Sequence, residues 1–173
     1  MPKPPSTQSL YELYREKLPS YVNVTWAFIL DDELDSARSC LEEQPFWANG
    51  PNEGHDYMLI AVLDCLEASY DYAEENFHYA LAHYMELNDV AMVRIIHLYL
   101  AYIEFTSNHS TLFLEHLAQG LREDNNESKE LNYWWHPTIM EPVFTQAIIH
   151  GHYPKHAKAI LELHGCFFSI EDK

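Results

Sequence analysis

The chain has 173 residues, 47% of them apolar and 21% charged, so it is long enough to bury a sizeable core as one domain or a small array. Its 5 glycines argue against a turn-rich β fold and favour long helices. Its net charge of −17 argues against direct binding to nucleic acid or to an anionic membrane, because both require a basic surface.

The first 20 residues are predicted to be a tail or linker that contains one short helix from Leu10 to Lys17. Three early prolines favour an extended start, and the segment has no apolar signal-peptide core. No apolar run in the chain approaches the length that spans a membrane. We expect the helical-repeat domain to cover 21–165 and a short C-terminal tail to cover 166–173.

An acidic stretch begins within the first expected helical unit. From Asp31 to Glu75 there are 13 acidic residues and one base, Arg38, which gives this stretch a net charge of −12. Acidic side chains of this kind commonly solvate the outside of helices. The alternative is that they steer a basic partner toward this side of the protein.

The chain repeats itself at an offset of 120 residues. The segment AFILDDELDSARSCLEE (27–43) aligns with AIIHGHYPKHAKAILEL (147–163), and two more units of the same design lie between them, so the mean period is 40 residues. Each unit is predicted to be a helix, a short polar turn and a second helix. The aligned identical pairs are Ala27 and Ala147, Ile29 and Ile149, Ala37 and Ala157, Leu41 and Leu161, and Glu42 and Glu162.

Apolar residues in the two middle units recur at helical spacing. Small residues are expected where two helices cross closely, and bulky residues where they reach a neighbouring helix. One hairpin cannot bury its own apolar face, whereas four stacked hairpins can. The residues of this pattern are Ala61, Ala73, Phe77 and Ala80 in the second unit and Ala101, Phe113, Leu117 and Gly120 in the third.

Local signals set the boundaries between these helices. Asn88-Asp89 is expected to cap a helix that runs from Val90 to Phe105, and the next turn is expected at 106–110. Two longer polar segments, 44–55 and 122–130, are predicted to be loops.

The segment DYAEENFHYALAHYMELND (71–89) resembles the second helix of a tetratricopeptide repeat, in which a small residue, an aromatic and an alanine recur as Ala73, Phe77 and Ala80 do here. The 40-residue period resembles the variant in the sensor arms of maltose-regulator-type transcriptional activators and related signal-transduction ATPases. NYWWHPTIMEPVFTQAIIHG (132–151) is also similar to a segment near the end of such arms.

This resemblance covers Tyr21 to Gly165 and implies an all-α, right-handed array of about four stacked helical hairpins. It also implies a role as a sensor arm in a transcription-regulating or signalling protein. The sequence has no phosphate-binding Gly-rich loop and no basic recognition helix, so the resemblance implies one arm without the motor or the DNA-binding end.

In stacked helical hairpins the first helices line the concave side, where partners usually dock. Tetratricopeptide proteins that grip acidic peptide ends carry Lys, Arg or Asn there, and this chain does not. The wall is therefore expected to suit an amphipathic helix or an extended apolar peptide, with core packing or self-association as the alternative. In the tetratricopeptide register the wall consists of Met58, Val62, Cys65, Ile95, Leu98, Tyr102 and Phe105.

Trp134 and Trp135 are adjacent, and two prolines follow them. Neighbours on a helix point about 100° apart, so the two rings cannot share one face. The prolines place the start of the next helix between Thr138 and Glu141. One ring is expected to brace the groove between the third and fourth units, and the other either braces it too or faces a partner.

The three cysteines, Cys40, Cys65 and Cys166, are odd in number and far apart. This spacing fits neither a disulfide framework nor a zinc site, and it favours a reducing, cytoplasmic setting.

His150, His152 and His156 are clustered, but Gly151 and Pro154 place the first two in a turn, so we expect no metal and no other cofactor. The sequence contains no P-loop, no nucleophile elbow and no Gly-rich nucleotide fingerprint, and the protein is not expected to be an enzyme.

Together these features predict a non-catalytic protein-interaction or regulatory module that binds a peptide, a protein or a small effector in a concave aromatic groove. The partner is expected to be basic or amphipathic, and a homodimer is an alternative use of an exposed aromatic patch. The alternative function is a small acidic helical-repeat chaperone that shields a secreted or aggregation-prone substrate in the same groove.

Overall fold

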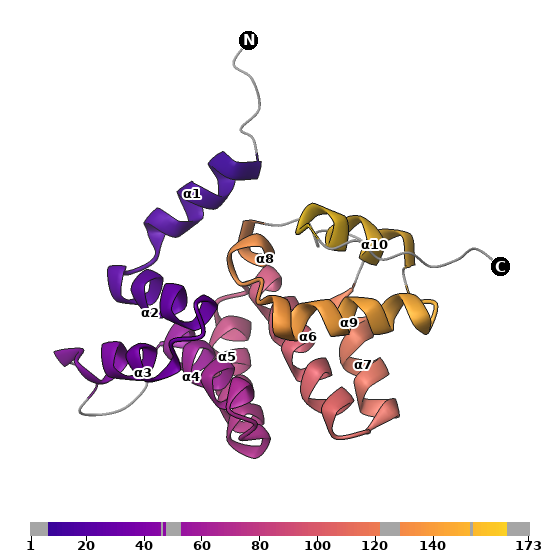
Figure 1. The fold of residues 1–173 in the computed structure, drawn as a ribbon, viewed down its shortest axis with the longest axis horizontal. Helices are drawn as coiled ribbons and strands as arrows, with labels where there is room; N and C mark the ends of the chain where they lie inside the picture. The colour runs from indigo at the N-terminus through magenta and orange to yellow at the C-terminus, as the bar shows by residue number, and fades with distance from the viewer. Residues whose placement is uncertain (1–6, 46, 48–52, 122–128, 153, 166–173) are drawn as a thin grey trace, which may run out of the picture.

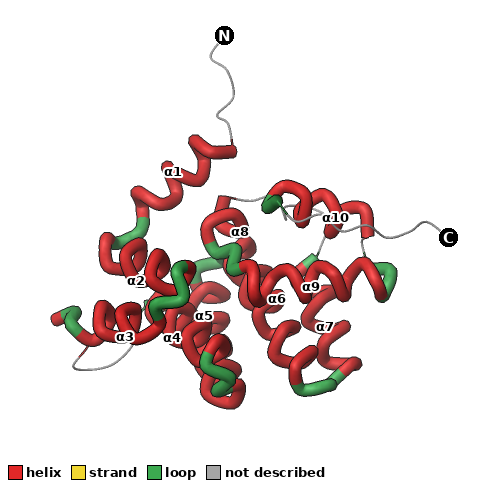
Figure 2. Tube along the Cα trace, in the orientation of Figure 1, coloured by secondary structure: helices red, strands yellow, loops and turns green. Residues whose placement is uncertain are grey.

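The computed structural model describes residues 7–45, 47, 53–121, 129–152 and 154–165, and it places no strand in them. This confirms the prediction of an all-α protein. Figures 1 and 2 show how the helices of these residues are arranged. In chain order they are α1 (Thr7–Lys17), α2 (Ser20–Leu30), α3 (Leu34–Glu42), α4 (Gly54–Leu66), α5 (Tyr70–Glu86), α6 (Val90–Thr106), α7 (Ser110–Gly120), α8 (Lys129–Tyr133), α9 (Pro137–Ile149) and α10 (Pro154–Leu163).

Eight of these helices form four hairpins of consecutive helices: α2 with α3, α4 with α5, α6 with α7, and α9 with α10. The two helices of each hairpin contact each other. The hairpins also contact their neighbours, since α2 and α3 touch α4, α5 touches α6, and α6 touches α9 (Figure 1). Each hairpin can therefore cover apolar surface of the next.

The four hairpin turns share one backbone geometry. Each contains a residue in the left-handed region: Asp32, Ala68, Asn108 and Gly151, with φ of 60°, 60°, 59° and 71°. In each turn the following amide donates to the carbonyl five residues before it. This is the Schellman pattern that closes the end of a helix. The same pattern also ends α5, where Asn88 has φ of 53° and the amide of Asp89 donates to the carbonyl of Tyr84 at 2.9 Å, so it occurs between hairpins as well as within them.

The second helix of each hairpin buries one stripe and leaves its opposite side in water. Gly120 shows why small residues belong in these stripes, because a Cβ there would lie 2.4 Å from Cδ2 of Leu98. Helices α6 and α7 therefore cross too closely for a side chain at this position. The buried stripes match the predicted ones and include Ala37 and Leu41, Ala73, Phe77 and Ala80, Phe113, Leu117 and Gly120, and Ala157 and Leu161.

The first helices are buried on more than one side. As predicted, Asp89 caps α6, and its side chain accepts a hydrogen bond from the amide of Met92 at 3.2 Å. A helix that is apolar all round must be covered all round. The buried residues of α6 are Met92, Ile95, Ile96, Leu98, Tyr99, Leu100, Ala101, Ile103 and Glu104.

The alignment at an offset of 120 holds for the second helices but is wrong for the first helices. Ala37 and Ala157 are both buried, whereas Ala27 is exposed and Ala147 is buried. The reason is one extra residue in the last turn, since Ala37 is the fifth residue after its left-handed position and Ala157 is the sixth. The first helices of units one and four therefore align when Asp32 is placed opposite Gly151, which is one residue earlier than the offset of 120 places it.

Helix α9 begins at Pro137, so the predicted start between Thr138 and Glu141 is wrong, and Pro142 lies inside the helix. His136 before it is extended, with φ −112° and ψ 116°, as expected for a residue that precedes proline. Pro142 is the sixth residue of the helix, beyond its first turn, so it removes one helical hydrogen bond, the one that an amide there would donate to the carbonyl of Thr138.

Helices α1 and α8 lie outside the four hairpins and contact each other, and α8 also contacts α6. Helix α1 contains the predicted short helix but begins earlier, at Thr7. Its contact with α8 ties the N-terminal segment to the array.

Two predicted loops are shorter than expected. Helix α8 begins at Lys129, within the loop predicted at 122–130, and α4 begins at Gly54, within the loop predicted at 44–55. Residues 46, 48–52 and 122–128 of these segments, and the predicted tail at 166–173, lie outside the described residues.

Candidate functional site

Only two of the eight residues named for the predicted docking surface reach the surface. Tyr102 is half-buried and Phe105 is 38% exposed. The other six pack in the core, as does Cys65 from the same wall, so the open aromatic groove expected from them does not form. The chaperone hypothesis relied on the same groove. The six buried residues are Met58, Val62, Ile95, Leu98, Trp134 and Trp135.

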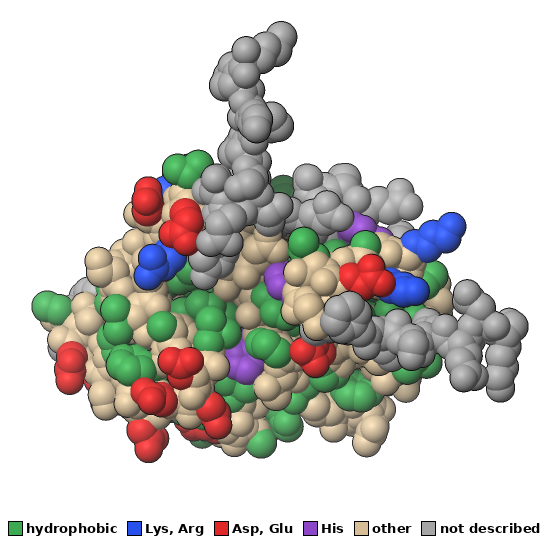
Figure 3. Space-filling model, turned by 45° about the horizontal axis from the view of Figure 1, so that its top comes forward, with side chains coloured by type: hydrophobic (Ala, Val, Ile, Leu, Met, Phe, Trp, Pro, Cys, Tyr) green, Lys and Arg blue, Asp and Glu red, His purple; other side chains and the backbone are tan. Residues whose placement is uncertain are grey.

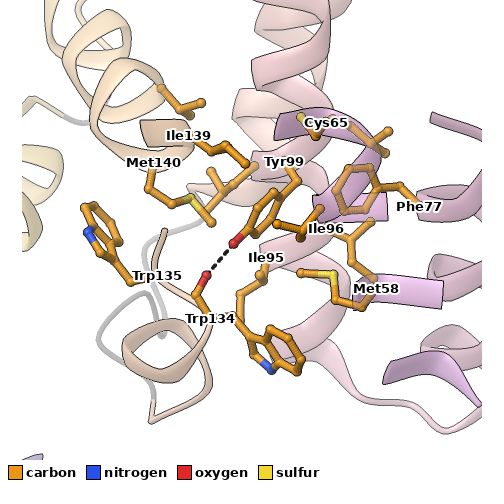
Figure 4. Close-up of a cluster of buried hydrophobic side chains, with 14 of the residues drawn as sticks. Met58, Cys65, Phe77, Ile95, Ile96, Tyr99, Trp134, Trp135, Ile139 and Met140 are labelled. Carbon is orange, nitrogen blue, oxygen red and sulfur yellow. Dashed lines mark hydrogen bonds between the residues drawn. The ribbon is translucent and has the colours of Figure 1, made fainter. Parts of the chain in front are cut away.

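Part of the predicted wall is covered by residues 129–136, which we call the inner segment. It comprises α8 and the three residues that lead into α9. Figure 4 shows Trp134 and Trp135 pointing to different sides of this segment, while Tyr99 reaches across from α6. Both tryptophans therefore act as braces, which answers the alternative left open by the sequence.

Two backbone carbonyls of the inner segment are hydrogen-bonded by side chains of the first helices. The indole Nε1 of Trp26 donates to the carbonyl of Tyr133 at 2.8 Å. The hydroxyl of Tyr99 donates to the carbonyl of Trp134 (Figure 4). Complete burial raises the pKa of Tyr99, so its hydroxyl stays protonated and remains a donor. A buried carbonyl without a partner would be costly, so these bonds hold the segment in place.

Side chains of the inner segment bond back to α1 and α2. The Trp134 indole donates to the hydroxyl of Tyr14 at 2.9 Å, and the Tyr133 hydroxyl donates to Oδ1 of Asn23 at 2.7 Å. The rings of Trp26 and Trp134 meet edge to face, with centroids 4.9 Å apart. Aromatic pairs in this arrangement attract each other beyond the area they bury.

Trp135 braces the other side of the inner segment. Its ring stacks on the imidazole of His164, at the end of α10, with centroids 4.0 Å apart and planes parallel to within 1°. Burial lowers the pKa of His164 to about 4, so this imidazole is neutral at physiological pH. Trp135 thus ties the last hairpin to the segment that covers the wall.

Sequence reasoning missed Tyr14, Trp26 and Tyr99 as partners of the inner segment. A usable signal was present in the first helices, since the run MVRIIHLYLAYI (92–103) is apolar except for Arg94 and His97. Such a helix has too much apolar surface for hairpin stacking alone to cover.

Several aromatic residues at or near the surface lie around the C-terminal end of α6. We call Tyr70, Tyr72, Tyr102 and Phe105 the turn edge. Tyr70 and Tyr72 line a hollow of about 340 Å³ together with Ser107, which follows α6. Tyr102 is next to Tyr70, and partial burial and this neighbour raise the pKa of Tyr102 to about 12. Its hydroxyl therefore stays a neutral hydrogen-bond donor at physiological pH.

A second, smaller hollow lies beside Phe105, between the α6–α7 turn and the end of α9. Its volume is about 150 Å³, and its walls include Phe105, Phe113 and His150. Glu104 is buried at this site, and its carboxylate is 2.7 Å from Nδ1 of His109. The turn edge thus places aromatic rings next to polar groups on both sides of α6.

The single base of the acidic stretch joins two hairpins. The Arg38 guanidinium lies 2.9 Å from Asp64 and 3.0 Å from Glu67, and Asn76 also donates to Asp64. The Glu67 and Asp64 carboxylates raise the pKa of Arg38. This contact ties α3 to α4 and α5, so the single base of the acidic stretch has a structural role.

Burial raises the pKa of the Cys65 thiol to about 12, which makes it a poor nucleophile. Among the described residues no three His, Cys, Asp or Glu side chains are placed to hold a metal ion. His150 lies at the end of α9, His152 lies in the turn that follows, and His156 lies in α10.

None of the described helices combines the length and the apolar character needed to cross a bilayer. Comparison of the chain with protein-family models, with curated proteins and with solved structures gave no match.

Proposed function

We propose that the protein is a non-catalytic protein-interaction module, built as a tetratricopeptide-like, right-handed array of four stacked hairpins. The similar backbone geometry of the four hairpin turns and the contacts between successive hairpins support this architecture. In such arrays each unit contacts mainly its neighbours, and the surface that remains is used for docking.

The observation that carries the proposal is the aromatic turn edge. Tyr72 is 68% exposed and Phe105 is 38% exposed, and hollows of about 340 and 150 Å³ flank them. Tyrosine and phenylalanine are enriched at protein interfaces, where a ring fills a pocket and a hydroxyl finds a partner. The turn edge contains Tyr102 and Phe105, the two residues of the predicted docking surface that the inner segment leaves uncovered.

We extend to this chain the regulatory role implied by the resemblance to sensor arms, in a cytoplasmic transcription-regulating or signalling system. The mechanism would act through α6, which contacts α5, α7, α8 and α9. A protein or peptide that binds the turn edge and shifts α6 would change packing on both sides of the array. Differential binding to two such packings is what a regulatory output requires.

The test is capture of partners from the native cytosol by the full chain and by the variants Tyr102→Ala and Phe105→Ala. Both variants should keep the melting temperature and lose most of the partner that the parent chain retains. Tyr79→Ala is the matched control, because Tyr79 is an exposed aromatic on α5 outside the turn edge. Equal yields of the same partner with all four proteins would contradict the proposal.

A further inference from the structure

The first hairpin carries a groove on the side that faces away from the rest of the array. We call it the outer groove. It has a volume of about 420 Å³ and runs between α2 and α3. Its apolar floor includes Val24, Phe28 and Cys40, and the acidic residues Asp35 and Glu43 stand beside them. None of the other described helices contributes to its lining.

The equivalent positions in later hairpins are covered by a neighbouring helix. Eight residues before the left-handed turn residue stand Val24, Ile60, Leu100 and Val143. Leu100 and Val143 are buried and Ile60 is half-buried, whereas Val24 is 47% exposed. The covered positions have a hairpin before them in the array, and the first hairpin has none among the described residues.

The residues four positions before each left-handed turn residue show the same difference in exposure. Phe28 is half-buried, but its equivalents Asp64, Glu104 and Ala147 are all buried. Terminal units of stacked arrays normally present a polar outer face. The first described hairpin instead keeps an apolar strip at positions that are buried or half-buried in the later hairpins, and a helix with one apolar face fits this strip.

The surroundings of the outer groove are acidic. It lies at the start of the stretch from Asp31 to Glu75, whose net charge is −12. Figure 3 shows acidic side chains gathered over the half of the molecule that carries α3 to α5. Arg38, the base of this stretch, is already engaged by Asp64 and Glu67. Lys or Arg residues beside an apolar face would complement this surface.

We propose that the outer groove docks a helix of a partner protein that has one apolar face flanked by Lys and Arg. The apolar face packs on Val24 and Phe28, and the basic flanks meet Asp35 and Glu43. This site is independent of the turn edge. A second copy of this chain is disfavoured as the occupant, because two proteins with a net charge of −17 repel each other.

The test uses an 18-residue synthetic peptide of Leu and Lys that forms an amphipathic helix. It is titrated into the isotope-labelled full chain and followed by NMR. Shift changes should concentrate on α2 and α3. Val24→Glu should weaken binding about tenfold, the loss expected when one apolar contact is replaced by a charge in the interface. Asp35→Asn with Glu43→Gln should weaken it less and reduce its salt dependence.

Val24→Glu also separates docking from general charge attraction. It adds one negative charge, so an association driven by net charge alone would become tighter. The matched control is Leu163→Glu, which adds the same charge at an exposed residue of α10 and should leave affinity unchanged or slightly raised. Tighter binding of Val24→Glu, shift changes spread over the whole surface, or no binding of the Leu–Lys peptide to the parent chain would each overturn the proposal. Circular dichroism confirms that each variant is folded.

Discussion

Two tyrosines on α6 are three residues apart and have opposite environments. Tyr99 is completely buried and donates to the carbonyl of Trp134, whereas Tyr102 is half-buried at the turn edge beside Tyr70. Both belong to α6, a largely apolar helix. The difference lies in what the chain supplies to cover each one, since the inner segment covers Tyr99 and ends before it reaches Tyr102. The same helix therefore serves as core in its middle and as a candidate docking surface at its end.

The largest expected effect on stability comes from removing the buried ring of Trp134. Trp134→Ala should lower the free energy of unfolding by about 3–5 kcal/mol, because it removes a buried ring and leaves a cavity among α1, α2 and α6. Urea unfolding measures the loss. Trp134→Phe should cost clearly less, and a loss under 1 kcal/mol for the alanine variant would mean that the inner segment does not brace the array.

A second change tests how closely α6 packs against α7. Gly120→Ala should cost about 1–3 kcal/mol, because its Cβ would meet Leu98 at 2.4 Å and the buried leucine has to move. The double variant Gly120→Ala with Leu98→Ala should show strong coupling in a double-mutant cycle, because removing the leucine makes room for the new methyl group. Additive losses would show that the two residues do not meet.

Removing the base of the acidic stretch tests the join between the first two hairpins. Arg38→Met should cost about 1–3 kcal/mol, because Asp64 is buried and loses its charged partner. Arg15→Met, at an exposed residue of α1, should change stability by less than about 0.5 kcal/mol. Urea unfolding of both variants checks the contrast, and equal losses would count against a structural role for the Arg38 contacts.

Acid should lower the free energy of unfolding, because it protonates buried histidines. Burial lowers the pKa of His55, His116, His136 and His164, the last to about 4. In the unfolded chain these histidines bind protons below about pH 6.5, whereas in the folded chain they stay neutral to lower pH. Protonation therefore favours the unfolded chain below about pH 6.5, and the folded chain is most stable with respect to these residues above that pH. That contribution should fall as the pH drops from about 6.5 toward 4. Urea midpoints across this range measure it, and His164→Phe, which can keep a ring on Trp135, should flatten the curve.

The smallest expected effect on stability is at the turn edge. Tyr72→Ala should change the free energy of unfolding by less than about 0.5 kcal/mol, because this side chain is 68% exposed. The same variant should weaken capture of a turn-edge partner. A large loss of stability in thermal unfolding would show that the edge is structural, and the contrast with Tyr99 would disappear.

Much of the fold followed from local pattern. The stripes Ala73, Phe77 and Ala80 and the cap at Asp89 depend on residues within a few turns of one another, and the structure confirms them. The alignment of the first helices was wrong because one added turn residue shifts a helix without changing its apolar character. The start of α9 was wrong because Pro137 occupies the first helical position, where the missing N–H of a proline costs nothing.

The docking surface could be predicted only in part, because its exposure depends on a distant segment. Met58, Ile95 and Leu98 are well placed for a concave wall by register alone. Leu98 is buried against Gly120 of α7, and the inner wall is closed in part by residues 129–136, which return to meet Trp26 more than a hundred positions away along the chain. A periodic pattern carries no information about such a contact. Tyr102 and Phe105 remain candidates because that segment ends short of them.

The most direct measurement of the central claim, that the chain closes its own inner wall, is hydrogen exchange at the indole N–H groups of Trp26 and Trp134. Each donates a hydrogen bond inside the array, to the carbonyl of Tyr133 and to the hydroxyl of Tyr14. Both protons should exchange only through global unfolding, with the free energy that urea unfolding gives. Exchange at the rate of an exposed indole, in a chain that is otherwise folded, would contradict the account.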